Sequence, residues 1–377
     1  MHIALVHDWL IGARGGEKVL ESLSELFPGA DLFTLVYDEK KTNPIFRKHR
    51  IFTSPLQRLP FGKSKYPYYL PFYWELMGSF DLSGYDLIVS SSSACAKWIR
   101  NPKKVPHVCY CHTPMRYIWH LFDDYFGTRS ISPMRLAVQS FRDYLQHCDL
   151  RSNEGVTHFL ANSTEVQERI KELYGRDSKI IFPPVDLDRF QMKKGPGDYF
   201  LVVSALVPYK RVDLAVRVCS RRNWPLVVVG SGSQMGKLKA LAGPSIKFAG
   251  WVSDEGLPAY YSQAKALLFP GLEDFGIVPL EAQAAGCPVI AFGKGGVRDT
   301  LKDGVTGVNF MEQTEEALEQ AIEKFLALPR FDPEILRKRV LPYSKARFNY
   351  QIQTYVRKIF GMEPALKPAG MKETGEV

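Results

Sequence analysis

The sequence predicts an α/β protein made of two Rossmann-like, doubly wound domains that face a cleft. Short apolar runs alternate with stretches of helical periodicity, which is typical of a parallel sheet with helices on both faces. Pro183 and Pro184 interrupt this alternation, and the same alternation starts again after them. A chain of 377 residues is also too long for a single hydrophobic core.

The elements follow from the apolar periodicity. In the first half, we expect strands at 2–7, 31–36, 87–89, 105–111, 158–161 and 179–182. The expected helices of this half are 16–27, a short one between 93 and 98, 133–148 and 163–174. Ser163 can cap the last of these helices, because its hydroxyl can accept from a free N–H of the first turn.

The second half repeats the pattern. Strands are expected at 199–204, 225–230, 246–248, 266–269 and 288–292. Helices are expected at 212–220, 235–242, 256–262, 279–285, 314–328 and over most of 337–360. We therefore predict domains at 1–184 and 185–345, followed by a segment 346–377 in which a helix crosses back to the first domain and ends in a loose tail.

Composition narrows the class of protein. The hydrophobic content of 45% and charged content of 24% are those of a soluble globular protein. No apolar run approaches the length of about 20 residues that a membrane-spanning helix needs. The first residues lack the basic start of a secretion signal, so we expect a cytoplasmic protein. The six cysteines have apolar neighbours and no zinc-site spacing, so we expect buried free thiols.

The net charge of +9 is concentrated in one segment. Residues 40–74, here called the basic aromatic segment, carry eight Lys or Arg, nine aromatic residues and no Asp or Glu. This mixture suits an anionic lipid surface, and it would also suit nucleic acid or a solvated loop with some aromatic packing. We expect peripheral contact with the inner face of the cytoplasmic membrane and no nucleic-acid partner. A nucleic-acid-binding protein is the alternative from another functional class.

Residues 271–286 contain two glutamates, Glu273 and Glu281, with seven residues between them. Pro279 suits the first position of a helix that Gly286 would end. Free N–H groups at such a helix start attract anions, and the helix dipole adds to the attraction. The N–H groups that would precede or cap the helix belong to Phe275, Gly276, Ile277 and Val278. The alternatives are an exposed turn for Glu273 and a simple dipole interaction for Glu281.

Three further groups follow expected strands. Gly15 and Gly16 open the first helix, where the backbone can approach an anion closely. Lys210 and Arg211 follow the strand at 199–204 and could hold the charges of a diphosphate, or form a solvated basic turn. His112 ends the strand at 105–111, where it could be structural or could lie in the predicted cleft.

The segment 271–286 resembles the Glu-x7-Glu motif of the retaining family-4 glycosyltransferases, which have the GT-B fold. The resemblance extends to Gly-Cys-Pro-Val-Ile-Ala at 286–291 and to the turn at Gly295 and Gly296, and it spans roughly residues 1 to 350. It implies transfer of a hexose from a nucleotide sugar to an acceptor hydroxyl with retention of the anomeric configuration. Residues 1–184 would then bind the acceptor and residues 185–345 the nucleotide sugar.

The resemblance also implies roles for single residues. Glu273 would hold sugar hydroxyls, Glu281 the ribose, and Lys210 the diphosphate, while His112 would lie near the transferred sugar. The implied catalytic residues are His112, Glu273 and Lys210. The implied donor-binding residues are Gly15, Gly16, Arg211, Gly230, Val252, Phe275, Gly276, Ile277, Val278 and Glu281.

The run Tyr-Cys-His-Thr-Pro-Met-Arg-Tyr-Ile-Trp at 110–119 resembles a subgroup that builds bacterial surface polysaccharides, often from GDP-mannose. We therefore expect GDP-mannose as the donor, with a UDP-hexose as the alternative. The expected acceptor is a saccharide or a polyprenyl-diphosphate-linked sugar. Arg116, Tyr117 and Trp119 could shape the acceptor side or could pack in the core.

The chain departs from the family in one place. Ala205 stands where members usually have an Arg that contacts the diphosphate, so Arg211 would have to replace that contact. No Asp-x-Asp motif appears where a metal site would be needed, so we expect activity without a divalent metal and without another cofactor. A nucleotide-sugar epimerase, a phosphorylase and a nicotinamide-dependent oxidoreductase are alternative enzymes. The glycine turn at 15–16 lacks the full dinucleotide fingerprint of the last one.

Overall fold

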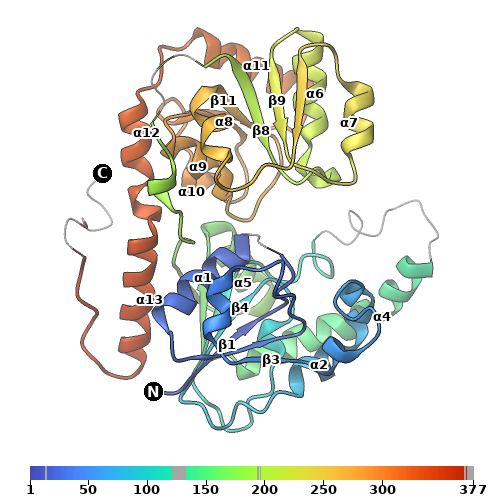
Figure 1. The fold of residues 1–377 in the computed structure, drawn as a ribbon, viewed down its shortest axis with the longest axis vertical. Helices are drawn as coiled ribbons and strands as arrows, with labels where there is room; N and C mark the ends of the chain where they lie inside the picture. Colours follow the sequence, from blue (N-terminus) through green and yellow to red (C-terminus); the bar gives the residue numbers. More distant parts are fainter. Residues whose placement is uncertain (13–14, 121–132, 193–194, 196, 369–370, 372–377) are drawn as a thin grey trace. The chain divides into compact units, whose positions relative to one another are not determined.

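Pro183 and Pro184 lie where the chain passes from one folding unit to the next. A computed structural model describes residues 1–12, 15–120, 133–192, 195, 197–368 and 371. The first unit is formed by Met1–Pro184 and Phe348–Leu366, and the second unit begins at Val185 and includes the chain to Arg347 (Figure 1). Each unit contains one parallel β-sheet with helices packed on it, which confirms the predicted α/β class with two Rossmann-like domains.

The sheet of the first unit has seven strands. They are β1 (Ile3–His7), β2 (Asp31–Thr34), β3 (Ile51–Thr53), β4 (Leu87–Ser92), β5 (His107–Cys111), β6 (His158–Ala161) and β7 (Ser178–Ile180). Their order across the sheet is β3-β2-β1-β4-β5-β6-β7, and every pairing is parallel. In such a sheet all the carboxyl ends of the strands lie along one edge, where ligands of doubly wound folds bind.

Helices cover both faces of this sheet. They are α1 (Gly15–Leu26), α2 (Tyr73–Gly78), α4 (Pro133–Arg151), α5 (Thr164–Tyr174) and α13 (Lys345–Ile359). Side chains of β1 alternate between two cores: Leu5 packs in the core that contains residues of α1 and α13, and Val6 packs in the core that contains residues of α2 and α4. The Ser163 hydroxyl caps α5 by accepting from the Val166 N–H at 3.1 Å, as the sequence predicted.

Helix α13 returns the chain to the first unit, which includes Phe348–Leu366 (Figure 1). Phe348, Ile352 and Val356 recur every four residues, so they share one helix face, and all three are buried in the α1 core. The Phe348 ring also contacts Tyr110 of β5, with 5.7 Å between ring centres. Of the tail predicted after residue 360, positions 369–370 and 372–377 lie outside the described residues.

The sheet of the second unit has six strands. They are β8 (Tyr199–Val203), β9 (Leu226–Val229), β10 (Ile246–Gly250), β11 (Ala264–Phe269), β12 (Val289–Phe292) and β13 (Gly307–Phe310). The order is β10-β9-β8-β11-β12-β13, and all pairings are parallel. Its helices are α6 (Val212–Arg221), α7 (Met235–Leu241), α8 (Leu257–Gln263), α9 (Ile277–Ala284), α10 (Val297–Thr300), α11 (Glu315–Ala327) and α12 (Pro333–Val340).

Several features differ from the sequence prediction. The edge strands β3 and β13 were not predicted, because β3 has only two apolar residues, Ile51 and Phe52, and because Gly307 and Asn309 interrupt the apolar pattern of β13. The helix expected between 93 and 98 is only a 3-10 turn at Ala96–Trp98. The buried carboxylate of Asp8 accepts the N–H groups of Ala94, Cys95 and Ala96 at 2.6–3.1 Å, and this tertiary contact fixes the segment as a loop.

Two predictions from composition can be compared with the structure. All six cysteines are buried and unbridged, as predicted. None of the helices in the described parts of the chain has both the length and the apolar character needed to cross a membrane.

Candidate active site

His112 directly follows β5, at the carboxyl edge of the first sheet. Its Nε2 lies 2.8 Å from the Ser91 hydroxyl, and the same hydroxyl lies 3.2 Å from Nδ1 of His7. The side chains of His7, Ser91 and His112 thus form one hydrogen-bonded chain across the ends of the neighbouring strands β1, β4 and β5. Nδ1 of His7 also lies 3.1 Å from the Ser91 carbonyl oxygen, which can only accept a hydrogen bond. Nδ1 of His7 therefore carries the proton, and the Ser91 hydroxyl can donate its own proton to Nε2 of His112.

The glycine turn lies beside the same histidines. A Cβ atom on Gly16 would lie 3.6 Å from Nε2 of His112 and 3.7 Å from Cε1 of His7. The first helix starts at Gly15, and residues 13 and 14 of the turn lie outside the described residues. The structure therefore brings Gly16 and His112 together, and we call His7, Gly16, Ser91 and His112 the His112 group.

The backbone of His112 is also held. Its N–H donates to the carbonyl of Ser92 at 2.8 Å, and its carbonyl accepts from the Asn162 amide at 2.9 Å. Sequence reasoning missed Ser91, His7 and Asn162. Each of them ends or follows a predicted strand, so their position along the strands was the one available signal.

Trp119 belongs to a buried polar network. Its indole N–H donates to Asp149 at 2.8 Å, and Asp149 also accepts from Trp98 at 3.0 Å and Tyr174 at 2.7 Å. The ammonium of Lys97 lies 2.8 Å from the same carboxylate, and both side chains are almost fully buried. This surrounding fits the core-packing alternative for Trp119, although an acceptor role stays a prediction.

Arg116 and Tyr117 share a short turn with Trp119. Tyr117 packs against the core of the first unit, and burial raises the pKa of its hydroxyl well above the usual value. Arg116 is half-buried, and its carbonyl accepts from the N–H of His120 at 3.1 Å. Their acceptor roles also stay predictions.

In the second unit, the ammonium of Lys210 forms an ion pair with the carboxylate of Glu273. Lys210 ends a 3-10 turn after β8, and Glu273 lies in the loop after β11, the neighbouring strand. Gly271 lets the two loops touch, because a Cβ atom there would lie 3.0 Å from the Lys210 backbone. The sequence alone does not show this contact, because Lys210 and Glu273 are far apart along the chain.

The turn after β12 holds the Glu273 loop from the other side. The Gly296 N–H donates to the Glu273 carbonyl at 2.9 Å. A Cβ atom on Gly295 would lie 2.4 Å from that carbonyl oxygen, and one on Gly296 would lie 2.3 Å from Cα of Phe275. These approaches are closer than a side chain permits, so both positions require glycine. Phe275 is buried and contacts the ring of Tyr343, 6.0 Å away.

Helix α9 starts two residues earlier than predicted, at Ile277 instead of Pro279. Gly276 is its N-cap with φ 90°, a left-handed conformation that glycine adopts without strain. Among the described residues, none accepts a hydrogen bond from the N–H of Ile277 or Val278. The prediction that Gly286 follows the end of the helix is confirmed, because α9 ends at Ala284 and Gly286 has φ 73°.

Glu281 lies inside α9 and is buried. Its carboxylate accepts from the Tyr261 hydroxyl at 2.9 Å. Burial, together with the negative charge of Glu281, raises the pKa of Tyr261 well above its usual value, so this hydroxyl stays protonated and remains a donor. Tyr261 was missed by sequence reasoning, because nothing in the local pattern of α8 distinguishes it from an ordinary core tyrosine.

The remaining predicted donor-binding residues are spread along the same edge. Arg211 has φ 49°, and its side chain lies 3.4 Å from Asp213. Gly230 follows β9, where a Cβ atom would lie 1.8 Å from the Ser204 carbonyl oxygen. Val252 follows β10 and is half-buried. Arg211 is thus engaged locally, and its predicted replacement of the arginine missing at Ala205 stays a prediction.

The second-unit residues combine three chemical properties. Lys210 supplies a cation, Glu273 supplies a carboxylate in contact with it, and the α9 start supplies N–H donors in the loop that follows Glu273. Together they suit a ligand that joins an anionic group to a group with hydroxyls. We call Lys210, Glu273 and residues 276–278 the Lys210 group.

Family comparisons agree with this geometry. The family model described as Glycosyltransferase Family 4 matches residues 13–189, and the one described as Glycosyl transferases group 1 matches residues 185–347. The chain belongs to glycosyltransferase family 4. The two matched segments together span residues 13–347.

Individual relatives share about 30% of their residues with the chain over the aligned part. The chain is 33% identical over 178 residues to the GDP-mannose-dependent alpha-(1-6)-phosphatidylinositol monomannoside mannosyltransferase of Mycolicibacterium smegmatis, covering 39% of this chain and 47% of the relative. It is 28% identical over 186 residues to the O-antigen chain mannosyltransferase RfbU of Salmonella typhimurium, covering 46% and 52%. The aligned part therefore spans about half the length of these curated relatives.

A solved structure supports the fold of this glycosyltransferase over almost its whole length. The crystal structure of Anabaena Alr3699/HepE in complex with UDP-glucose aligns with a TM-score of 0.68 and 18% sequence identity. The alignment covers 95% of this chain and 100% of the other.

The hydrogen-bonded chain through Ser91 generates a prediction. Because this chain orients His112, we expect Ser91→Ala to lower kcat about fivefold, since the ring loses a bond whose net contribution is about 1 kcal/mol. The dissociation constant for the donor should change less than twofold, and Ser91→Thr, which keeps the hydroxyl, should recover most of the activity. Turnover and donor titration measure this, with exposed Ser79→Ala as the control. Wild-type kcat in Ser91→Ala would contradict the orienting role.

Proposed function

We propose that this family-4 glycosyltransferase moves mannose from GDP-mannose to a saccharide or a lipid-linked acceptor, with retention and without a divalent metal. The observation that carries the proposal is the contact between Lys210 and Glu273 beside the α9 start. In a nucleotide sugar the diphosphate is bonded directly to the sugar. A cation for the phosphate and a carboxylate for the sugar hydroxyls must therefore be neighbours.

The proposed reaction lowers its barrier mainly by stabilising the leaving group. As the bond between the anomeric carbon and the phosphate oxygen breaks, negative charge grows on the diphosphate. Lys210 and the N–H groups at Ile277 and Val278 are suited to this charge. The acceptor oxygen bonds to the anomeric carbon on the same face, and its proton passes to the leaving phosphate oxygen. His112 contacts the transferred sugar, and Glu281 holds the ribose.

Mannose is favoured as the transferred sugar by two relatives. Both matched proteins described above are named as mannosyltransferases, and the first is named as GDP-mannose-dependent. The sequence run at 110–119 independently resembles the subgroup that often uses GDP-mannose. A UDP-hexose stays the alternative donor.

The donor is tested by ligand-induced thermal stabilisation. A ligand that binds only the folded protein adds about 2.7 kcal/mol of stability at 100 times its dissociation constant. We expect GDP to raise Tm more than UDP or ADP at equal concentration. Lys210→Ala and Glu281→Gln should reduce the GDP shift and lower kcat/KM about 10- to 100-fold, because each removes a charged contact.

Exposed Lys237→Ala in the same unit is the matched control and should behave as wild type. A larger shift with UDP would replace GDP-mannose by a UDP-hexose. Normal transfer in both Lys210→Ala and Glu281→Gln would show that the Lys210 group is not the donor site.

Stereochemistry and metal use are tested on the same reaction. We expect the α-configured donor to give an α-linked product, seen by NMR of the anomeric proton, and turnover to persist in EDTA. A β-linked product would require direct displacement from the opposite face. Loss of turnover that added Mg²⁺ or Mn²⁺ restores would contradict metal-independent catalysis.

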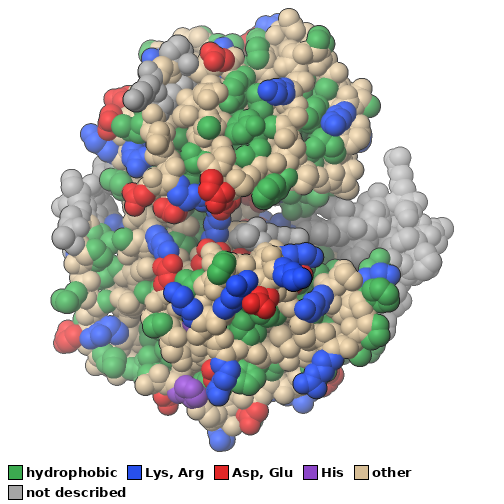
Figure 2. All heavy atoms as spheres, viewed as in Figure 1, with side chains coloured by type: hydrophobic (Ala, Val, Ile, Leu, Met, Phe, Trp, Pro, Cys, Tyr) green, Lys and Arg blue, Asp and Glu red, His purple; other side chains and the backbone are tan. Residues whose placement is uncertain are grey.

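The basic aromatic segment supports peripheral binding to an anionic membrane. All eight of its Lys and Arg side chains are exposed, and so are the rings of Phe61, Tyr68 and Phe72. Figure 2 shows Lys and Arg side chains interspersed with hydrophobic ones over the unit that carries β3 and α2. Phe46 and Tyr73 are buried instead, so only part of the aromatic content is available at the surface.

Sedimentation with lipid vesicles tests this attachment. We expect the protein to sediment with vesicles that contain anionic phospholipid, and to release as salt is raised, because each surface cation contributes about 1 kcal/mol that salt screens. Neutral vesicles of the same size are the control. Equal recovery with both kinds of vesicle, or no sedimentation with either, would contradict the proposal.

A further inference from the structure

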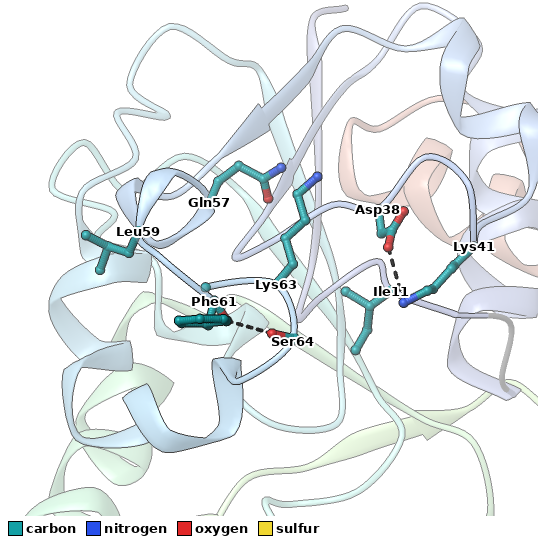
Figure 3. A pocket seen from close by; sticks show the side chains of 9 residues that line it. Ile11, Asp38, Lys41, Gln57, Leu59, Phe61, Lys63 and Ser64 are labelled. Carbon is teal, nitrogen blue, oxygen red and sulfur yellow. Dashed lines mark hydrogen bonds and ion pairs between the residues drawn. The ribbon is translucent and has the colours of Figure 1, made fainter.

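A pocket of about 550 Å³ lies beside the loops that follow β1, β2 and β3 (Figure 3). Its volume falls in the range that holds small-molecule ligands. The lining side chains that matter here are Asp38, Lys41, Gln57, Leu59, Phe61 and Lys63. Neither the proposed donor contacts nor the His112 group uses these residues, so the pocket is a separate feature of the first unit.

The loops around the pocket are fixed by contacts with the backbone. The Gln57 side chain accepts from the Tyr37 N–H at 2.9 Å and donates to the Tyr37 carbonyl at 3.1 Å, which ties the β2 loop to the β3 loop. A Cβ atom on Gly62 would lie 2.0 Å from the Leu56 carbonyl oxygen, so the chain folds tightly back there. Phe61 has φ 58°, which is strained for a bulky residue and is held by these neighbours.

The pocket is positively charged. Lys41 is paired with Asp38 at 3.4 Å, whereas no residue in the described part of the chain forms an ion pair with Lys63. In the view of Figure 3, the Lys63 side chain extends between those of Gln57 and Asp38. The surrounding segment 40–74 has no acidic residue that could neutralise it. An exposed, uncompensated ammonium in a preformed concavity suits a phosphate group.

The rim of the same pocket is apolar. Phe61 is 70% exposed and Leu59 is 46% exposed, although both are large hydrophobic residues. The Lys65 ammonium lies 5.3 Å from the Phe61 ring centre, which adds a cation at the edge of this rim. A ligand that covers the rim must therefore carry a hydrocarbon part next to its anionic part.

The pocket and His112 lie along one sheet edge. The pocket loops follow β2 and β3, and His112 follows β5, which is three strands from β2 and four strands from β3. Three to four strand spacings correspond to about 14–19 Å. A group bound in the pocket thus lies at a distance from the predicted reaction centre that an extended acceptor can bridge.

We propose that this pocket binds the phosphate or diphosphate of a lipid-linked acceptor, with Lys63 contacting the phosphate and Leu59 and Phe61 contacting the lipid chain. The inference rests on the proposed glycosyltransferase reaction and adds the class of acceptor and its binding site. Lys41 is a secondary contact, because Asp38 already engages its ammonium.

Farnesyl diphosphate is a suitable probe, since it joins a diphosphate to a short isoprenoid chain. Binding to the full-length protein is measured by calorimetry with GDP present at saturation, so that the donor site does not take up the probe. We expect Lys63→Gln to weaken farnesyl diphosphate binding about tenfold and Phe61→Ala about fivefold. Lys48→Gln, an exposed cation of the same segment outside the pocket, should have no effect.

Two further ligands distinguish the sources of affinity. Inorganic diphosphate should bind at least about tenfold more weakly than farnesyl diphosphate, and farnesol should bind more weakly still. Equal binding of inorganic diphosphate or of farnesol would overturn the proposal, as would unchanged binding in Lys63→Gln. The variant Lys210→Ala distinguishes the proposed donor site from the proposed acceptor pocket. Lys210→Ala should weaken GDP binding and leave farnesyl diphosphate binding unchanged, whereas Lys63→Gln should leave GDP binding unchanged. Each proposal can therefore fail while the other is still measured.

Discussion

The contact between Lys210 and Glu273 is the interaction on which the proposed reaction depends. Their loops follow β8 and β11, which are neighbours in the second sheet, so the parallel topology brings both to one edge. In the structure the two charges satisfy each other. A nucleotide sugar offers each a new partner, since the diphosphate can take the ammonium and sugar hydroxyls can donate to the carboxylate. Binding of the nucleotide sugar then gives each charge a new partner. Neither charge is left unpaired, which matters because an unpaired buried charge would be costly.

This arrangement is possible because several loop positions have no side chain. Gly271 lies against the Lys210 backbone, and Gly295 and Gly296 lie against the loop of Glu273. A methyl group at 295 or 296 would fall within 2.4 Å of that loop and would force it away from its strand end. The glycines therefore fix where the carboxylate and the start of α9 lie. Donors held in place before the reaction need no reorganisation when charge develops, and this is the main source of catalysis by such sites.

The sequence was sufficient for the order of elements and for the region around α9. Its apolar periodicity placed nearly every central strand, and Gly286 defined the end of the helix. It could not give the edge strands β3 and β13, because β3 has only two apolar residues and Gly307 and Asn309 interrupt the pattern of β13. Nor could it give the hydrogen bonds of Ser91 with His7 and His112, because these depend on the register between β1, β4 and β5. The hydrophobic pattern fixes which face of the sheet a side chain takes, but it does not show which residues of strands far apart in the sequence lie next to each other.

The first sheet uses its carboxyl edge at two separate places. The ends of β1, β4 and β5 carry the His112 group, and the loops after β2 and β3 carry the pocket with Lys63. A parallel sheet puts all these ends on one edge, so a single ligand can contact both places only by lying along that edge. With about 14–19 Å of sheet between β5 and the strands that carry the pocket loops, such a ligand must be extended. A short soluble sugar would reach one place alone, whereas a sugar attached to a lipid phosphate could place its hydroxyl near His112 while its phosphate is held at Lys63.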